Sequence, residues 1–282
     1  MIGFFLRLLW RLIVGTVAVA LAYATFFLAY PYLDKRFPTL VVIIAIYVFA
    51  AYLGIPLLVR LWKIVFRPRH LPQYATSGDG WSSDPINIAI VCKNETSLER
   101  AFAQSGWYKA DDGSIFNNLR MAAAVVFRLP YANAPFSKLF LFGRRHDVGY
   151  QIQTGTPPTP RHRHHIRFWR LLPDTPTRKE HQHNNFWDSI FARFSSGKQQ
   201  IWIGAATHDI GPLAIRVQNL QITHKIDRET NRERDYVIAT LKKSGAIRRH
   251  EIIKAGEPLS FRGQTFGVNI VTDGTLHVIE LK

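Results

Sequence analysis

The chain has 282 residues, of which 36 are lysine or arginine and 20 are acidic, so its formal net charge is +16. The single cysteine, Cys92, excludes a disulfide framework and a cluster of thiolate metal ligands. So positive a charge indicates a partner of opposite sign, either an anionic lipid surface or a nucleic acid.

The N-terminal part of the chain is strongly apolar. Residues 12–30 and 37–59 contain no charged side chain, and a helix over either run is long enough to cross about 30 Å of hydrocarbon. The turn between them contains Asp34, Lys35 and Arg36. We therefore predict that residues 1–66 form an antiparallel hairpin of two transmembrane helices that anchors the chain in a lipid bilayer.

The cations that flank this hairpin predict its orientation. The turn has only two, whereas the outer ends of the helices are flanked by Arg7, Arg11, Arg60, Lys63, Arg67 and Arg69. The positive-inside rule predicts that both ends of the chain lie in the cytoplasm, and the location that we expect is the bacterial inner (plasma) membrane. An alternative is that residues up to about Ala24 are a cleaved signal peptide. The soluble part is cytoplasmic under both hypotheses.

The rest of the chain is predicted to be a linker followed by a soluble domain. Residues 67–83 lack a hydrophobic period and contain proline, glycine and serine, which is typical of a linker, so the domain is expected over residues 84–282. Its first elements are a strand over 86–91, a helix that starts near Asn94 and ends at Gly106, and a helix over 114–129.

The later elements are mostly short strands. In chain order we predict strands over 138–142, 148–153, 164–172, 200–207, 213–217 and 221–225, a helix over 229–243 capped by Asp227, a strand over 246–253 and a hairpin over 268–281, with loops over 155–160 and 174–185. Helices and strands alternate without a strict βαβ rhythm. This order predicts an α+β fold, a mixed domain with mostly antiparallel strands.

Several motifs follow one another between residues 84 and 245. They are Asp84-Pro-Ile-Asn-Ile-Ala-Ile-Val91, Arg100-Ala-Phe102, Gly106-Trp-Tyr108, Leu141-Phe-Gly-Arg144, Arg163-His-His-Ile-Arg-Phe-Trp169, Trp202-Ile-Gly-Ala-Ala-Thr-His-Asp209, Thr223-His-Lys-Ile-Asp227 and Glu233-Arg-Asp235. This series resembles the LssY C-terminal domain family. Members are often attached to membrane modules that resemble type-2 phosphatidic acid phosphatases or DedA proteins, so the resemblance implies work at the cell envelope. Residues 1–66 contain none of the phosphatase signatures.

The densest polar segment of the sequence lies between residues 161 and 183. Six of the eleven histidines occur between His146 and His183. Residues two apart share a face of a strand, so His162 and His164 are weak candidates for a metal pair, and no metal or other cofactor is expected. The alternative is anion binding by arginines, because guanidinium groups match phosphates and carboxylates. The candidates are Arg161, Arg163, Arg167, Arg170 and Arg234.

Three residues are candidates for acid–base chemistry. His224 ends a predicted strand just before a helix, where sites often lie, and Asp209 and His165 belong to the other polar motifs. The chain has no Gly-x-Ser-x-Gly, P-loop or dinucleotide motif. Asp227 and Arg234 are more simply a helix cap and an ion-pair partner.

Two functions follow from these observations. The first is a membrane-anchored accessory or interaction protein of the cell envelope, which contacts the bilayer, anionic lipid headgroups and an envelope or secretion membrane protein. The alternative is a hydrolase for a phosphorylated or lipid-derived substrate, which requires His165, Arg167, Asp209 and His224 to converge in one cleft. Nucleic acid is an unlikely partner, because no helix gathers cations on one face.

Overall fold

The computed structural model describes residues 2–58, 74–78, 80–172, 184–194, 199–216, 220, 222–256, 258–262 and 269–282. The chain divides into two compact units. One contains the N-terminal apolar helices, and the other contains almost all of the mixed helix and strand domain.

The N-terminal unit is helical. It contains α1 (Ile2–Tyr23), the π-helical turn η1 (Ala24–Ala29), α2 (Tyr30–Asp34), α3 (Thr39–Phe49) and the π-helical turn η2 (Ala50–Gly54). Two stretches, Leu12–Asp34 and Thr39–Leu58, are long and apolar enough to cross a membrane. They match the two predicted spans, whereas the four cations predicted to follow the second span lie outside the described residues.

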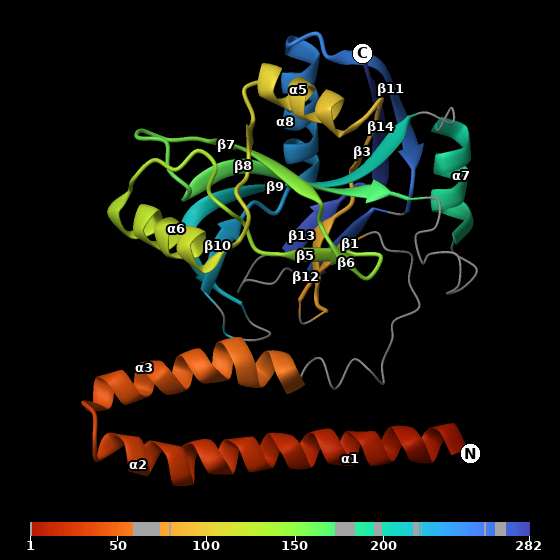
Figure 1. Ribbon diagram of the computed structural model, residues 1–282. Coiled ribbons are helices and arrows are strands. Elements are labelled where there is room, and N and C mark those ends of the chain that lie inside the picture. The colour runs from red at the N-terminus through yellow and green to blue at the C-terminus, as the bar shows by residue number, and fades with distance from the viewer. Residues whose placement is uncertain are drawn as a thin grey trace. The chain divides into compact units, whose positions relative to one another are not determined.

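The core of the second unit is an eight-stranded sheet (Figure 1). Its strands are β3 (Ile88–Cys92), β4 (Tyr108–Lys109), β7 (Val148–Gln153), β8 (His162–Leu171), β9 (Gln200–Ile215), β10 (Ile222–Ile226), β11 (Ile247–Lys254) and β14 (Thr275–Leu281). The order is β11-β14-β3-β9-β8-β7-β4, and β10 pairs with β9. Within this sheet, β14 and β3 are parallel and the other pairs are antiparallel. The predicted α+β class is confirmed.

Two helices cover one face of the sheet (Figure 1). They are α5 (Glu95–Gln104) and α8 (Thr230–Lys243), and their apolar residues pack against Ile166, Phe168 and Trp202. The helix α5 begins where the sequence predicts, because the Asn94 side chain accepts a hydrogen bond from the backbone N–H of Ser97 at 2.9 Å.

The opposite face of the sheet packs on a smaller sheet and a helix. The small sheet has the order β2-β1-β5-β6, with β1 (Tyr74–Ser77), β2 (Ser82–Pro85), β5 (Leu139–Leu141) and β6 (Arg144–Arg145), and the helix is α7 (Asn184–Phe194). Their apolar residues bury Trp169, Ile201 and Ile203. The unit also contains α6 (Ile115–Phe127) and the two-stranded pair of β12 (Leu259–Arg262) and β13 (Asn269–Thr272).

Three local predictions differ from the structure. The predicted linker contains β1 and the start of β2, because these short strands pair with each other and with the distant β5. The strands predicted over 200–207 and 213–217 form one strand, β9, which continues through Gly211-Pro212. Pro212 follows the last residue of β9 that pairs with β8, so it removes no hydrogen bond from the β8–β9 ladder. Finally, α8 begins after Glu229, while Asp227 accepts a hydrogen bond from the Glu229 N–H at 3.0 Å instead of capping the helix.

Candidate metal site and buried polar network

Alternation along β8 separates its polar side chains between the two faces of the large sheet. His164 shares the helix-covered face with Ile166 and Phe168, whereas Arg163, His165 and Arg167 point to the other face with Trp169. The register of β8 and β9 places His164 opposite His208, and His165 opposite Thr207. This division creates two separate polar groups.

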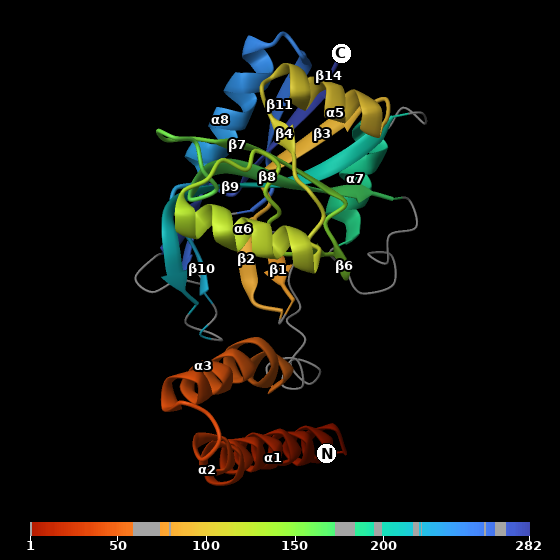
Figure 2. The ribbon, with the colours of Figure 1, turned by 60° about the vertical axis from the view of Figure 1, so that its left-hand side comes forward.

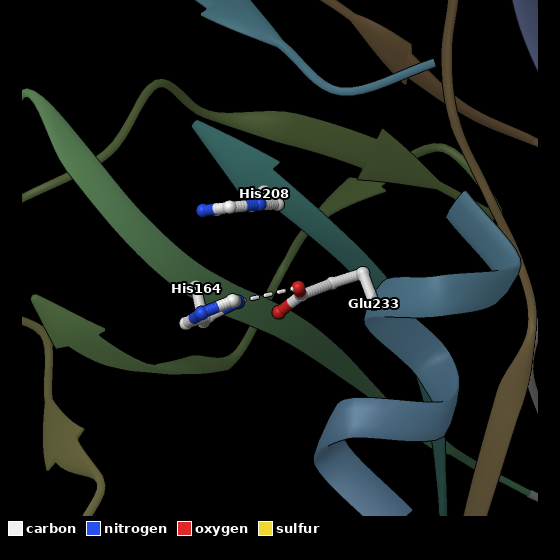
Figure 3. A group of neighbouring side chains, drawn as sticks. All are labelled: His164, His208 and Glu233. Carbon is white, nitrogen blue, oxygen red and sulfur yellow. Dashed lines mark hydrogen bonds and ion pairs between the residues drawn. The ribbon is translucent and has the colours of Figure 1, made fainter. Parts of the chain in front are cut away.

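The group on the helix-covered face contains three residues of the types that ligate metal ions. One potential ligand atom from each of His164, His208 and Glu233 lies within 4.8 Å of the others (Figure 3). They come from β8, β9 and α8 respectively. Two imidazoles and one carboxylate are a common ligand set for catalytic zinc and for non-haem iron. The two histidines are half-buried, so the group is not sealed from solvent.

Burial keeps this group neutral at pH 7. Burial, with the nearby Asp209 and Asp227 charges, raises the pKa of Glu233 to about 9, and burial lowers the pKa of His164 to about 4. A protonated Glu233 therefore donates its proton to Nδ1 of His164, with the Oε2–Nδ1 distance at 2.6 Å. The other carboxylate oxygen, Oε1, is buried and has no hydrogen-bond partner among the residues that the structure describes. In its ionised form, Glu233 would therefore place a buried negative charge beside a carboxylate oxygen that accepts no hydrogen bond from the described residues.

The rings in this group are stacked. The His164 ring lies between His208 and Tyr236, with centroid distances of 4.1 Å and 3.8 Å. Imidazole lone pairs lie in the ring plane, so two parallel rings direct them side by side rather than toward one point. Binding of one ion by both histidines therefore requires one ring to rotate, and His208 is only half-buried.

The group on the opposite face is a buried network of charges. Arg163 Nε lies 2.8 Å from Asp209 Oδ2, and Arg167 NH1 lies 2.7 Å from Asp84 Oδ2. All four side chains are at most 6% exposed. Burial alone opposes ionisation of Asp209, but its interactions with His165 and Arg163, including the Arg163 hydrogen bond, lower its pKa to about 2. Each buried carboxylate in this network is therefore matched by a guanidinium.

Further hydrogen bonds and one aromatic ring complete the network. The Thr207 hydroxyl oxygen lies 2.8 Å from Nε2 of His165 and 3.2 Å from Oδ2 of Asp84. Rotation about the C–O bond directs its hydrogen to one or the other. The Phe136 ring stacks on His165 at 5.3 Å between centroids and lies under the guanidinium carbons of both arginines, at 5.3 Å and 4.8 Å. Burial lowers the pKa of His165 well below its usual value. His165 is therefore neutral, and its Nδ1 is 3.7 Å from Asp209, beyond hydrogen-bond distance.

The structure places the acid–base candidates close together but inside the protein. His165, Asp209 and Arg167 belong to the network, and the charge of the half-buried His224 on β10 affects the pKa of Asp209. They converge, as the hydrolase hypothesis requires, but His165, Arg167 and Asp209 are buried rather than exposed to a cleft. The predicted pairing of His162 with His164 is replaced by a group in which His208 and Glu233 join His164. His181 and His183 lie outside the described residues.

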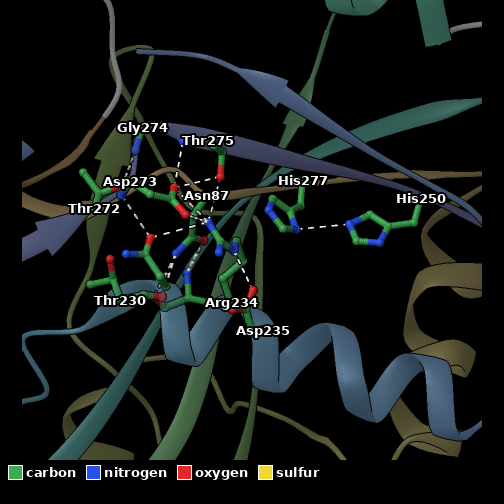
Figure 4. Close-up of polar contacts among 12 residues, drawn as sticks. Asn87, Thr230, Arg234, Asp235, His250, Thr272, Asp273, Gly274, Thr275 and His277 are labelled. Atoms are coloured by element: carbon green, nitrogen blue, oxygen red, sulfur yellow. Dashed lines mark hydrogen bonds and ion pairs between the residues drawn. The ribbon is translucent and has the colours of Figure 1, made fainter. Parts of the chain in front are cut away.

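The candidate anion-binding arginines have different environments. Arg163 and Arg167 are in the network, and Arg161 donates to the carbonyl of Val125 at 2.6 Å at the end of α6. Arg170 is exposed. The buried Arg234 donates to both oxygens of Asp273 at 2.9 Å and 2.8 Å, and to Thr275 at 2.8 Å (Figure 4). The structure therefore leaves Arg170 and part of Arg161 available to an external anion, while carboxylates within the fold occupy the other three.

Sequence reasoning placed His208 and Glu233 within the polar motifs but gave neither residue a role in a site. One signal for Glu233 was present, since Glu233, Val237 and Leu241 recur at a spacing of four and all three are buried in α8. A carboxylate on the buried stripe of an amphipathic helix is unusual unless it has a partner. His208 requires the register between β8 and β9, which the sequence does not specify.

Comparisons with known proteins yield one match. A family model described as "LssY C-terminus" matches residues 68–276. No curated protein and no solved structure matches the chain.

Proposed function

The chain belongs to the LssY C-terminus family, and on that premise we propose that it is a membrane-anchored, metal-dependent hydrolase. The proposed site is the group of His164, His208 and Glu233, and the substrate class is a phosphorylated or lipid-derived anion. The observation that supports this most strongly is the assembly of three potential ligands from three elements around a buried carboxylate that has no lysine or arginine partner in the described part of the chain. A divalent ion supplies the positive charge that Glu233 lacks.

The chemistry of this ligand set supports hydrolysis. His164, His208 and Glu233 would hold a divalent ion by three ligands, and such an ion would supply an activated water as the nucleophile. The surplus of positive charge on the chain, +16, favours an anionic substrate.

The location of this activity is part of the proposal. Two helices with the length and apolar composition of membrane spans support an anchor. The cations that flank them in sequence support a cytoplasmic position of the folded domain at a bacterial inner membrane. Reporter fusions at Lys282 and in the turn at residues 34–36 test this topology. An alkaline phosphatase fusion at Lys282 is expected to be inactive, and an active fusion contradicts the topology.

Metal-dependent turnover is the test of the activity. The full chain in detergent is stripped with EDTA, reloaded with Zn²⁺, Mn²⁺ or Fe²⁺, and assayed with p-nitrophenyl phosphate, its bis-ester and phosphatidic acid. We expect turnover only after reloading. His208→Gln should lower the turnover more than about 100-fold, because removing a metal ligand has a larger effect than removing a residue that hydrogen-bonds to a ligand. His250→Gln is the matched control, because His250 lies outside this group, with its Nε2 3.1 Å from Nδ1 of His277.

A second function is favoured by the burial of the acid–base candidates. His165 and Asp209 are too enclosed to touch a substrate, which agrees better with an accessory or interaction protein that contacts lipid headgroups and an envelope or secretion protein. The same experiment distinguishes the two functions. A chain that binds the metal stoichiometrically and turns over none of the esters is an accessory protein with a structural metal.

A further inference from the structure

The helix α6 presents an apolar surface to the outside of the folded unit. The side chains of Ile115, Phe116, Leu119, Val126 and Phe127 are between 63% and 83% exposed. In the other helices of this unit, by contrast, the large apolar residues are mainly buried against the sheet. A contiguous apolar patch on one helix is a feature that typically marks an interaction site.

This patch does not result from a misplaced core face. At 100° per residue, the exposed apolar residues occupy one side of α6, and the residues that pack inward occupy the other. The inward side carries Ala124 and Val125, which are buried, and Met121, which packs against Ala124 and Tyr131. The helix therefore has one apolar face for the protein core and a second, larger apolar face that the described part of the domain leaves exposed.

Cations lie at both ends of this outer face. At the N-terminal end, the Lys138 side chain lies beside Gly113, since a Cβ built on Gly113 would be 4.0 Å from Cε of Lys138. At the C-terminal end, Arg128 is exposed, and Arg161 holds the last carbonyls of the helix. An apolar face with basic residues at its borders matches the charge of an anionic membrane surface.

The place of α6 in the fold favours the same occupant. Figures 1 and 2 show α6 in the same half of the folded unit as β1 and β2. The first of these strands begins at Tyr74, and the second potential membrane span ends at Leu58, so only 15 residues separate them in the chain. With 13 residues, α6 is about 20 Å long, too short to cross about 30 Å of hydrocarbon. Its geometry suits a helix that lies in the plane of the interface.

We propose that α6 is an interfacial helix whose outer face, Ile115 to Phe127, inserts into the headgroup region of an anionic bilayer. This inference goes beyond the proposed metal site and rests only on the membrane anchor of the proposed function. Insertion to a depth of about 5–10 Å buries the exposed apolar side chains, and Lys138 and Arg128 then meet lipid phosphates. The attraction between these cations and the lipid phosphates decreases as the salt concentration rises.

Quenching by brominated lipid tests this placement in the full chain. Single cysteines at Leu119, Gln104 and Val19 are labelled with an environment-sensitive fluorophore in liposomes with and without anionic lipid, while the native Cys92 is buried. Leu119→Cys reports on α6, Gln104→Cys on an exposed site of α5, and Val19→Cys on the anchor. We expect several-fold stronger quenching at position 119 than at position 104. The quenching at position 119 should decrease in neutral liposomes, and also when Lys138 and Arg128 are replaced by glutamate.

The three labels separate the possible failures. Quenching at position 19 without quenching at 119 overturns the interfacial helix and leaves the anchor intact, and α6 then faces a protein partner or water. Absence of quenching at both positions overturns the anchor itself. Equal quenching at 104 and 119 also contradicts the proposal, because it shows contact with lipid that α6 does not determine.

Discussion

The two faces of the β8–β9 pair differ in the partners of their buried carboxyl groups. Toward the small sheet, Asp84 and Asp209 each lie within 2.8 Å of an arginine nitrogen. Toward the helices, the described residues provide no lysine or arginine ion pair for Glu233, and burial keeps it protonated at pH 7. The first arrangement is balanced and can only stabilise the fold. The arrangement around Glu233 lacks one positive charge. We take this lack of a cation as the feature that distinguishes the proposed metal site from the structural network.

The largest effect is expected from removing one partner of the balanced network. Arg163→Met leaves the charge of Asp209 buried without its arginine, which costs about 3–5 kcal/mol of unfolding free energy. Denaturant unfolding of the full chain in detergent, followed by tryptophan fluorescence, measures this loss. Arg170→Met on the same strand is the control, because Arg170 is exposed and its loss should cost less than about 0.5 kcal/mol. Equal losses in the two variants would contradict a structural role for the network.

A smaller loss is expected when the ring over the network is displaced. A Cβ at Gly149 would lie 2.2 Å from Cε2 and 2.6 Å from Cζ of Phe136. Gly149→Ala therefore pushes Phe136 off His165 and should cost about 1–3 kcal/mol, as overpacking does. Gly113→Ala has no atom closer than 4.0 Å to its new methyl group and serves as the control. Recovery of stability in the double variant Gly149→Ala/Phe136→Leu would identify the ring as the cause.

On the other face, the prediction concerns pH. The pKa of Glu233 is about 9 in the folded chain and 4.5 without burial, so the folded state binds one more proton than the unfolded state between these values. Its contribution to stability is complete below pH 4.5 and is lost as the pH rises through 9. The lowered pKa values of His164 and His208 act in the opposite direction, but only below about 6.5. The window for Glu233 alone is therefore pH 6.5 to 9.

Glu233→Gln tests this sign. Without metal, the wild-type melting temperature should decrease from pH 6.5 to 9, with a loss of at most about 1.4 kcal/mol per pH unit. Glutamine keeps a donor for His164 and does not titrate, so the variant should show a flatter profile. The melting temperatures of both proteins are measured by differential scanning fluorimetry in EDTA. Parallel profiles in the two proteins would show that Glu233 does not carry the proton.

The sequence predicted the fold class, and the period of two along a strand accounts for the division of polar residues between the faces of β8. Alternation places Arg167 with His165 and Trp169, opposite Ile166 and Phe168, as the structure shows. Periodicity also predicted the two apolar helices and α8, because these patterns are local. The short strands β1 and β2 were missed, since β2 pairs only with β1 among the described strands, and β1 pairs with β5, about 60 positions away in the sequence.

The membership of the metal group depends on the same kind of distant contact. His164 was a candidate, but its neighbour in sequence, His162, does not join it. The strand register brings in His208, and the packing of α8 brings in Glu233. Both depend on how β9 and α8 pack, which residue spacing alone does not specify. In the same way, charge alone did not distinguish the buried Arg163 from the exposed Arg170.

Equilibrium binding of Zn²⁺ to the full chain most directly tests the claim that the unbalanced face is a metal site. Dialysis of the wild type, His208→Gln and Glu233→Gln against buffered Zn²⁺, with metal content measured by mass spectrometry, gives stoichiometry and affinity. We predict one ion for each wild-type chain, and a loss of affinity of more than about 100-fold in both variants but not in His250→Gln. Equal zinc binding in all four proteins, or no binding by the wild type, would contradict the account.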